Sequence, residues 1–336
     1  MLLFPLTRTL IDIDSTTGRE REVGDFLYQY LYRLAEGTGG TVERMPVEGD
    51  RFNVFAAWGE PVVVLSTHMD TVPPFIPSSE DGEFVWGRGA CDTKGIIAAM
   101  IQAVEELLAE GRRGFGLLFV VGEETDSRGA QVANRNPRGS RFLINGEPTE
   151  NRLALGSKGA LYLKVEAAGR AAHSAYPELG ASAIDRLLEA LARLRTVPLP
   201  SDPVLGETTL NVGTLTGGRA ANVVADYAQA EVILRTVGET EGLRRDLTAA
   251  LEGIEGVRIA EVRETPAVHL ASLPGFETTV VKYTTDVPHL GAWGQPFLLG
   301  PGSIHVAHTA EERIAKRDLE EAVRLYKEMV RRLQNR

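Results

Sequence analysis

The chain has 336 residues, 43% hydrophobic and 24% charged, which is ordinary for a globular protein and long enough for two domains. Its net charge of -10 argues against a nucleic-acid partner, because binding phosphate needs a basic surface. A single cysteine excludes an internal disulfide, and no run approaches the roughly 20 apolar residues that span a bilayer. We therefore expect a cytoplasmic protein that binds neither nucleic acid nor membrane.

The first 150 residues predict strands that alternate with helices. Apolar positions at helical spacing indicate two helices within 6–35, separated by the turn at 15–18. A further helix is expected over 96–109. Strands are expected near 40–45, 52–58, 61–67, 116–121 and 141–145. This alternation predicts an α/β fold with a mostly parallel sheet covered on both faces by helices.

The pattern changes after residue 156. Strand, helix, strand, strand, helix and strand then follow, which suggests a ferredoxin-like α+β arrangement. The strands are expected over 160–168, 208–215, 226–235 and 256–263, and the helices over 181–195 and 240–251. We therefore predict a catalytic domain from residues 1–156 and 266–336, with residues 157–265 inserted. A last amphipathic helix is expected over 311–334.

Polar side chains follow several of the buried strands at their carboxyl ends, where open α/β sheets place their sites. Two histidines with several carboxylates suit zinc or another divalent transition metal better than calcium. More than four candidates suggest two ions, with one carboxylate bridging them. The candidates are His68, Asp70, Asp92, Glu123, Glu124, Glu147 and His308.

Taken singly, each candidate has an ordinary alternative. Glu123 and Glu124 could begin an exposed helix, since acidic residues favour helix N-termini. Asp92 could be a turn residue after the glycine-rich loop. His308 could belong to a helix start capped by Thr309. The metal hypothesis rests on all of them following strands of one predicted sheet.

Three motifs carry a resemblance to a known family. They are 66–73 (STHMDTVP), 86–95 (WGRGACDTKG) and 122–124 (GEE). In the same order follow 145–148 (NGEP), 172–174 (AHS) and 300–302 (GPG) with His308. Together they resemble the two-zinc family of acetylornithine deacetylase, succinyl-diaminopimelate desuccinylase, aminoacylase and glutamate carboxypeptidase. The resemblance covers nearly the whole chain and implies a zinc-peptidase fold with an inserted lid and dimerisation domain.

The resemblance also implies a ligand set for two zinc ions, with cobalt as an alternative. His68 and Glu147 would bind one ion, Glu124 and His308 the other, and Asp92 would bridge them. All five residues are of the types that the family uses at these positions. A catalytically inactive relative is therefore not expected.

Further roles follow from the same resemblance. Asp70 would orient His68, and Glu123 would be the general base that takes a proton from water activated by the two ions. His173 would donate to the oxyanion from the inserted domain of a partner subunit. The ordinary alternative for His173 is that it only caps a turn.

Substrate recognition is assigned to two more residues. Arg235 and Asn222 would hold the α-carboxylate of the substrate, since a guanidinium suits a bidentate carboxylate contact. The alternative for Arg235 is an ion pair with Asp226 or Glu231 on the sheet surface.

These residues predict a homodimeric hydrolase that cleaves the amide of a small N-acyl amino acid. The stretch 300–308 most resembles the acetylornithine deacetylase branch, which would place the protein in arginine biosynthesis. A desuccinylase, an amino-acid-carrier hydrolase of lysine or arginine synthesis, and a dipeptidase or carboxypeptidase stay open as alternatives. From another class, a non-catalytic binding protein of the same fold is disfavoured by the complete ligand set.

Overall fold

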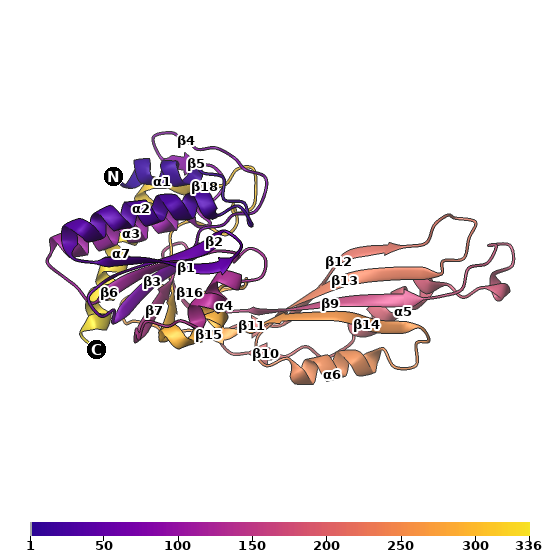
Figure 1. Cartoon of the computed structure of the whole chain (residues 1–336). Coiled ribbons are helices and arrows are strands. Elements are labelled where there is room, and N and C mark those ends of the chain that lie inside the picture. The colour runs from indigo at the N-terminus through magenta and orange to yellow at the C-terminus, as the bar shows by residue number, and fades with distance from the viewer. Residues whose placement is uncertain (1) are drawn as a thin grey trace. The chain divides into compact units, whose positions relative to one another are not determined.

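The structure is a computed structural model that describes residues 2–336, and it divides into two compact units (Figure 1). Unit 1 runs up to Leu155 and takes in Leu270–Thr279 and Thr285–Arg336. Unit 2 comprises Gly156–His269 and Val280–Thr284. Within residues 2–336, no helix combines the length and the apolar character needed to cross a bilayer.

Unit 1 is built on a six-stranded sheet in the order β1-β2-β6-β3-β7-β17. The strands β6, β3, β7 and β17 are parallel, whereas β1 and β2 are antiparallel to their neighbours. This confirms the predicted mostly parallel sheet. The strands are β1 (Thr41–Glu48), β2 (Arg51–Trp58), β3 (Val63–His68), β6 (Phe115–Val120), β7 (Phe142–Asn145) and β17 (Gln295–Leu298).

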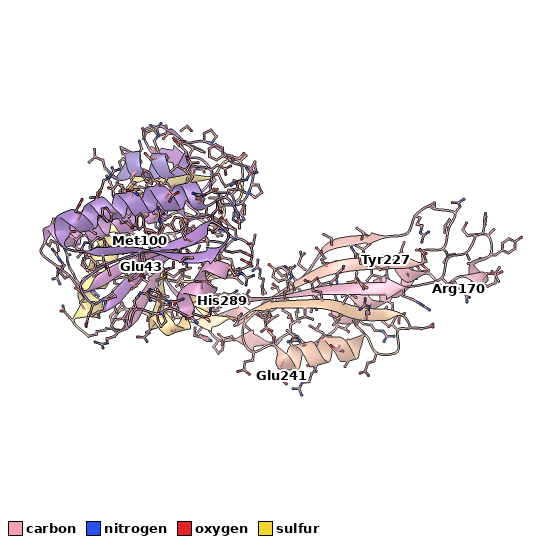
Figure 2. All side chains as sticks on the ribbon, viewed as in Figure 1. Glu43, Met100, Arg170, Tyr227, Glu241 and His289 are labelled. Carbon is pink, nitrogen blue, oxygen red and sulfur yellow. The ribbon has the colours of Figure 1, made fainter. Side chains whose placement is uncertain are left out.

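Helices cover both faces of this sheet, which explains why its strands are apolar without alternation. Along β6, Leu117 packs in the core with the long helices, and Leu118 packs on the other face with Ala130 and Trp293. Figure 2 labels Met100, which is buried in the core on the long-helix side. The helices are α1 (Leu3–Ile11), α2 (Arg21–Thr38), α3 (Lys94–Ala109), α4 (Arg128–Asn134) and α7 (Lys316–Gln334), with 3₁₀ turns at Val287–His289 and Gly291–Trp293.

The start of the last helix differs from the sequence prediction. The helix α7 begins at Lys316 rather than at 311, and the preceding β18 (Arg313–Ala315) is a strand. β18 pairs antiparallel with β5 (Phe84–Trp86), which also pairs with β4 (Ser79–Glu80). Apolar spacing could not reveal this difference, because the buried Ile314 suits either structure and long-range pairing decides between them.

Unit 2 contains an antiparallel sheet in the order β12-β13-β9-β14, the strand order of a ferredoxin-like fold (Figure 1). Its two helices, α5 and α6, share one hydrophobic cluster with the alternate residues of β13 and β9, so both lie on the same face of the sheet. The elements are β9 (Gly159–Ala168), α5 (Ala183–Leu194), β12 (Thr209–Gly217), β13 (Tyr227–Thr236), α6 (Glu241–Ala250) and β14 (Val257–Thr265).

Several short elements complete the chain. Unit 2 adds a hairpin of β10 (Ser201–Asp202) and β11 (Gly206–Glu207), and a 3₁₀ turn at Pro177–Leu179. Where the chain passes from one unit to the other lie β8 (Leu153–Ser157), β15 (Val268–His269) and β16 (Thr278–Val281).

Candidate metal centre

His68 is the last residue of β3, and its surroundings fix both its main chain and its ring. Thr67 donates a hydrogen bond to the Gly146 carbonyl at 2.7 Å, and Thr93 donates to the His68 carbonyl at 2.5 Å. The ring Nδ1 lies 3.0 Å from the Asp70 main-chain oxygen and 3.5 Å from the Asp70 carboxylate. When Nδ1 donates a proton there, Nε2 presents a lone pair, as a metal ligand must.

The carboxylate of Asp70 joins the ends of two strands. Its Oδ1 accepts the main-chain N–H groups of Gly122 at 2.9 Å and Glu123 at 3.1 Å. Its Oδ2 accepts the N–H of Glu124 at 3.2 Å and the hydroxyl of Thr17 at 2.8 Å. Asp70 therefore sets the position of the acidic pair that follows β6 as well as contacting His68.

Asp92 lies between two histidines. Its Oδ1 is 3.0 Å from His68 Nε2, and its Oδ2 is 3.2 Å from His308 Nε2. The same His308 nitrogen is 3.1 Å from Glu124 Oε1. One ligand atom from each of His68, Asp92 and Glu124 lies within 4.8 Å of the others, which makes this group a candidate metal site. Each oxygen of Asp92 thus faces a different histidine, as a bridging carboxylate requires.

Glu147 supplies the clearest indication that a cation belongs here. It follows β7, is 4% exposed, and its Oε1 has no hydrogen-bond partner within the described residues 2–336. Burying an unpaired carboxylate is costly unless a cation or donor meets it. Its main chain is held close to α3, because Gly146 has room for no side chain: a Cβ there would lie 2.4 Å from Ile96. These donors fit a divalent transition metal.

The charges of the cluster shift the acid–base properties of its members. Burial raises the pKa of Glu123 and of Glu147 well above the usual carboxyl value, and the nearby charge of His68 only partly opposes this. For Asp92 burial acts in the same direction, but its contacts with His308 and His68 outweigh burial and lower its pKa. The contacts of His308 with Asp92 and Glu124 raise the pKa of His308 to about 10. The half-buried Glu123, with its raised pKa, is suited to carrying a proton.

Asp286 is a buried acid that sequence reasoning missed. It is 1% exposed and lies beside the side chain of Ser127, whose contact only partly opposes the effect of burial on its pKa. Burial raises its pKa to about 7, and its charge in turn raises the pKa of Glu123 and Glu147. The signal available was composition, since Asp286 is the sole Asp, Glu, Lys or Arg between Tyr283 and Gln295.

His173 lies in unit 2, on the exposed loop between β9 and α5. Its Nδ1 accepts the N–H of Ala175 at 3.1 Å, so Nε2 is left as a potential donor. This contact also matches the turn-capping alternative. The N–H of Ser174 donates to the Asn222 carbonyl at 3.0 Å, so the loops of His173 and Asn222 are neighbours.

Arg235 is half-buried near the last residue of β13, and its Nη1 is buried with no hydrogen-bond partner in the part of the chain that the structure describes. Among residues 2–336 it forms no ion pair, and Asp226 pairs with Arg219 instead. Asn222 precedes Tyr227, the first residue of β13, which Figure 2 labels. At about 3.3 Å per strand residue, Asn222 and Arg235 of one chain are more than roughly 25 Å apart. Within one chain they cannot hold the same carboxylate.

Comparisons with known proteins agree with this architecture. The model of a family described as peptidase family M20/M25/M40 matches residues 64–332. A peptidase M20 domain-containing protein of Schizosaccharomyces pombe is 41% identical over 340 residues, with 98% of this chain and 84% of that protein covered. A probable carboxypeptidase of Aspergillus terreus is 40% identical over 369 residues, with 96% of this chain and 84% of that protein covered.

A solved structure shares the fold across its full length. The crystal structure of a tripeptidase from Staphylococcus aureus superposes with a TM-score of 0.83, with 98% of each chain covered. Sequence identity to it is 22%, so this likeness concerns the fold alone.

Proposed function

The chain belongs to the peptidase family M20/M25/M40 and is a hydrolase of that metallopeptidase family, and we propose that it cleaves the amide joining an acyl or peptidyl group to an amino acid with a free carboxylate. One observation carries the proposal: the two oxygens of Asp92 face two different histidines, at 3.0 Å and 3.2 Å. A site that holds two cations against one carboxylate is suited to polarising an amide and its attacking water.

The ligand assignment follows the sequence motifs and is supported by the contacts. His68 and Glu147 would hold one ion, Glu124 and His308 would hold the other, and Asp92 would be shared by both. When bound, two such ions supply Lewis acidity and bring the pKa of a water near neutrality. Zinc suits this mixture of imidazole and carboxylate, and cobalt can replace it.

The remaining chemistry is assigned to groups of the chain itself. Glu123 accepts the proton of the attacking water and delivers it to the leaving nitrogen, a role suited to a carboxylate whose main chain is held next to the assigned ligand Glu124 by Asp70. Asp70 keeps the ring of His68 oriented through the contact at Nδ1. His173 of a second copy donates from Nε2 to the oxygen of the attacked carbonyl as negative charge develops there.

Carboxylate recognition is assigned to Arg235, because its Nη1 has no acceptor among the described residues and could donate to a substrate carboxylate. Asn222 lies at the other end of β13, on the loop beside that of His173. Both can therefore serve one substrate only when Asn222 and His173 come from one subunit and Arg235 from the other. This arrangement makes a homodimer part of the proposal.

Two kinds of enzyme with this chemistry differ in the group on the acyl side of the amide that they cleave. The motif at 300–308 favours an acetylornithine deacetylase-like enzyme and thus arginine biosynthesis. The names of relatives such as the probable carboxypeptidase favour a peptidyl group instead. Both branches need a free carboxylate on the amino acid that leaves.

The test is a panel of substrates offered to the zinc- and cobalt-loaded protein. It comprises N-acetylornithine, N-succinyl-diaminopimelate, N-acetylmethionine, N-blocked and free dipeptides, and the carboxamide of each acid. We expect turnover of acids and little turnover of the matching carboxamides. Equal rates on an acid and its carboxamide would overturn the carboxylate requirement, and preference for blocked dipeptides would place the protein with carboxypeptidases.

A further inference from the structure

Glu312 lies four residues after His308 and is almost fully buried, with 1% of its surface exposed. Its Oε1 accepts three main-chain N–H groups from one loop. They belong to Gly89 at 2.9 Å, Cys91 at 3.3 Å and Asp92 at 3.3 Å. A single carboxylate oxygen therefore holds the loop that presents the central carboxylate of the metal centre.

Arg88, on the same loop, is the partner of Glu312. Its Nη1 lies 2.6 Å from Glu312 Oε2 and also donates to the Thr309 carbonyl at 3.1 Å. Its Nε donates to the Pro74 carbonyl at 3.3 Å. Arg88 is 2% exposed, so this is a buried ion pair. It ties the loop of Asp92 to the residue that directly follows His308.

We propose that Glu312, with Arg88 as its counter-ion, is a positioning residue that fixes the carboxylate of Asp92 relative to His308. The inference rests on the proposed two-metal function, because the separation of two ions depends on where the bridging carboxylate and the ligands on either side of it are held. Glu312 touches neither metal nor substrate in this scheme. It acts through the main chain of Asp92.

A negative charge at Glu312 is needed for a geometric reason. A carboxylate can accept the three N–H groups on one oxygen and the guanidinium on the other. A glutamine has one acceptor oxygen, and its NH₂ group would face either the guanidinium or the loop N–H groups. The loop must then shift, and the shift is transmitted to Asp92. Outer contacts of this kind typically change metal affinity or activity by about 10–100-fold.

The competing explanation is that the pair only stabilises the fold. Removing one member of a buried ion pair is destabilising, because it leaves the other charge unpaired, whereas replacing both members is often neutral. A stabilising role and a positioning role therefore differ in the double variant. It should regain stability in both cases, but it should regain metal affinity only if Glu312 does nothing more than stabilise.

The experiment uses the full chain and three variants. Glu312→Gln removes the charge, Arg88→Met/Glu312→Gln removes both charges, and Glu311→Gln is the matched control at an exposed neighbour. The readouts are zinc stoichiometry and affinity in chelator competition, the visible spectrum of the cobalt-loaded protein, and the melting temperature. We expect Glu312→Gln to lower the affinity for one of the two zinc ions about 10–100-fold and to change the visible spectrum of the cobalt-loaded protein. The control should match the wild type.

The double variant decides between the two roles. We expect it to regain the melting temperature of the wild type but not the lost zinc affinity or the cobalt spectrum. The proposal is overturned if Glu312→Gln binds two ions as the wild type does. It is also overturned if the double variant regains zinc affinity together with stability. Should Glu312→Gln fail to fold, the double variant carries the test, since it buries no unpaired charge.

The same measurements separate this inference from the proposed function. If the wild type binds two ions but cleaves none of the amides tested, the proposed function fails and the effect of Glu312→Gln on zinc affinity still decides the inference. If the wild type binds fewer than two ions at saturating zinc, both fail. If it binds two and cleaves amides while Glu312→Gln behaves normally, only the inference fails.

Discussion

The two units hold their assigned residues in opposite ways. In unit 1, hydrogen bonds within the chain fix the ends of the strands that carry the candidate ligands. Asp70, which is assigned to orient His68, accepts four hydrogen bonds besides its contact with that residue. In unit 2 His173 and Asn222 are exposed, and Nη1 of Arg235 has no hydrogen-bond partner among the described residues. The residues of the metal centre are therefore positioned by contacts within one chain, whereas the substrate-binding residues of unit 2 still have hydrogen-bond donors available.

From this contrast we expect mutations in the two units to impair different properties of the protein. Changes in unit 1 that move a ligand should alter metal content. Changes at the unused donors of unit 2 should leave metal content intact and alter only how substrate is bound and turned over. Each of the following predictions tests one side of that division.

The largest effect is expected at Glu123, which lies beside the ligands without being assigned as one. Glu123→Gln should reduce turnover by about 10²–10⁴-fold, the usual contribution of a general acid–base group. Two ions should stay bound, as measured by elemental analysis alongside steady-state rates. If the variant loses an ion, the assignment is reversed: Glu123 is then a ligand and Glu124 the proton carrier.

A somewhat smaller effect is expected at His173. Removing a donor to a developing oxyanion typically costs about 10²–10³-fold in rate, so His173→Ala should fall in that range with its metal content unchanged. Mixing this variant with Glu123→Gln should restore part of the activity through hybrid dimers. Absence of recovery, once subunit exchange is verified by a labelled subunit, would contradict a contribution from the second copy.

Arg235 sharpens the comparison further. A charge-assisted hydrogen bond is worth about 1.5–3 kcal/mol, so Arg235→Ala should lower kcat/KM by about 10–150-fold for a substrate with a free carboxylate. The carboxamide of that substrate should be affected little, and zinc content not at all. Arg219→Ala, which breaks an exposed ion pair in the same unit, is the control. Equal losses on acid and carboxamide would refute the carboxylate role.

The smallest effect concerns stability and belongs to unit 1 alone. Asp286 and His308 have folded-state pKa values raised to about 7 and about 10. The folded protein therefore keeps protons that the unfolded chain releases, and the metal-free protein should lose stability as pH rises to about 8. Above pH 8 the lowered pKa of buried Lys94, about 8, acts in the opposite direction. Calorimetry should show the melting temperature falling between pH 5 and 8, and zinc should counteract the fall. In Asp286→Asn the fall between pH 5 and 7 should be weaker, and an unchanged profile would contradict this.

Sequence reasoning reached the secondary structure of both units because strands and helices depend on short-range signals. The metal-site candidates came from motifs that resemble a known family, and the structure brings four of them, His68, Asp92, Glu124 and His308, into contact. Periodicity and turn residues define the strands; His68 is the last residue of β3, and Glu124 lies four residues after the end of β6. What it missed depends on distant contacts. Glu312 falls within the helix expected over 311–334, because nothing local reveals its partner Arg88, more than two hundred residues earlier. Asp286 lies in a stretch with no helical or strand pattern at all.

The placement of unit 2 in the middle of the chain has a consequence for biosynthesis. β17, α7 and His308 of unit 1 all follow unit 2 in sequence. A ribosome adds about 5–20 residues per second, and domains generally fold as units. Unit 2, nearly continuous, is thus available to fold while unit 1 still lacks an edge strand and a ligand. The metal centre is therefore among the last features to be completed, and a nascent chain that stalls before residue 308 cannot hold the second ion as assigned.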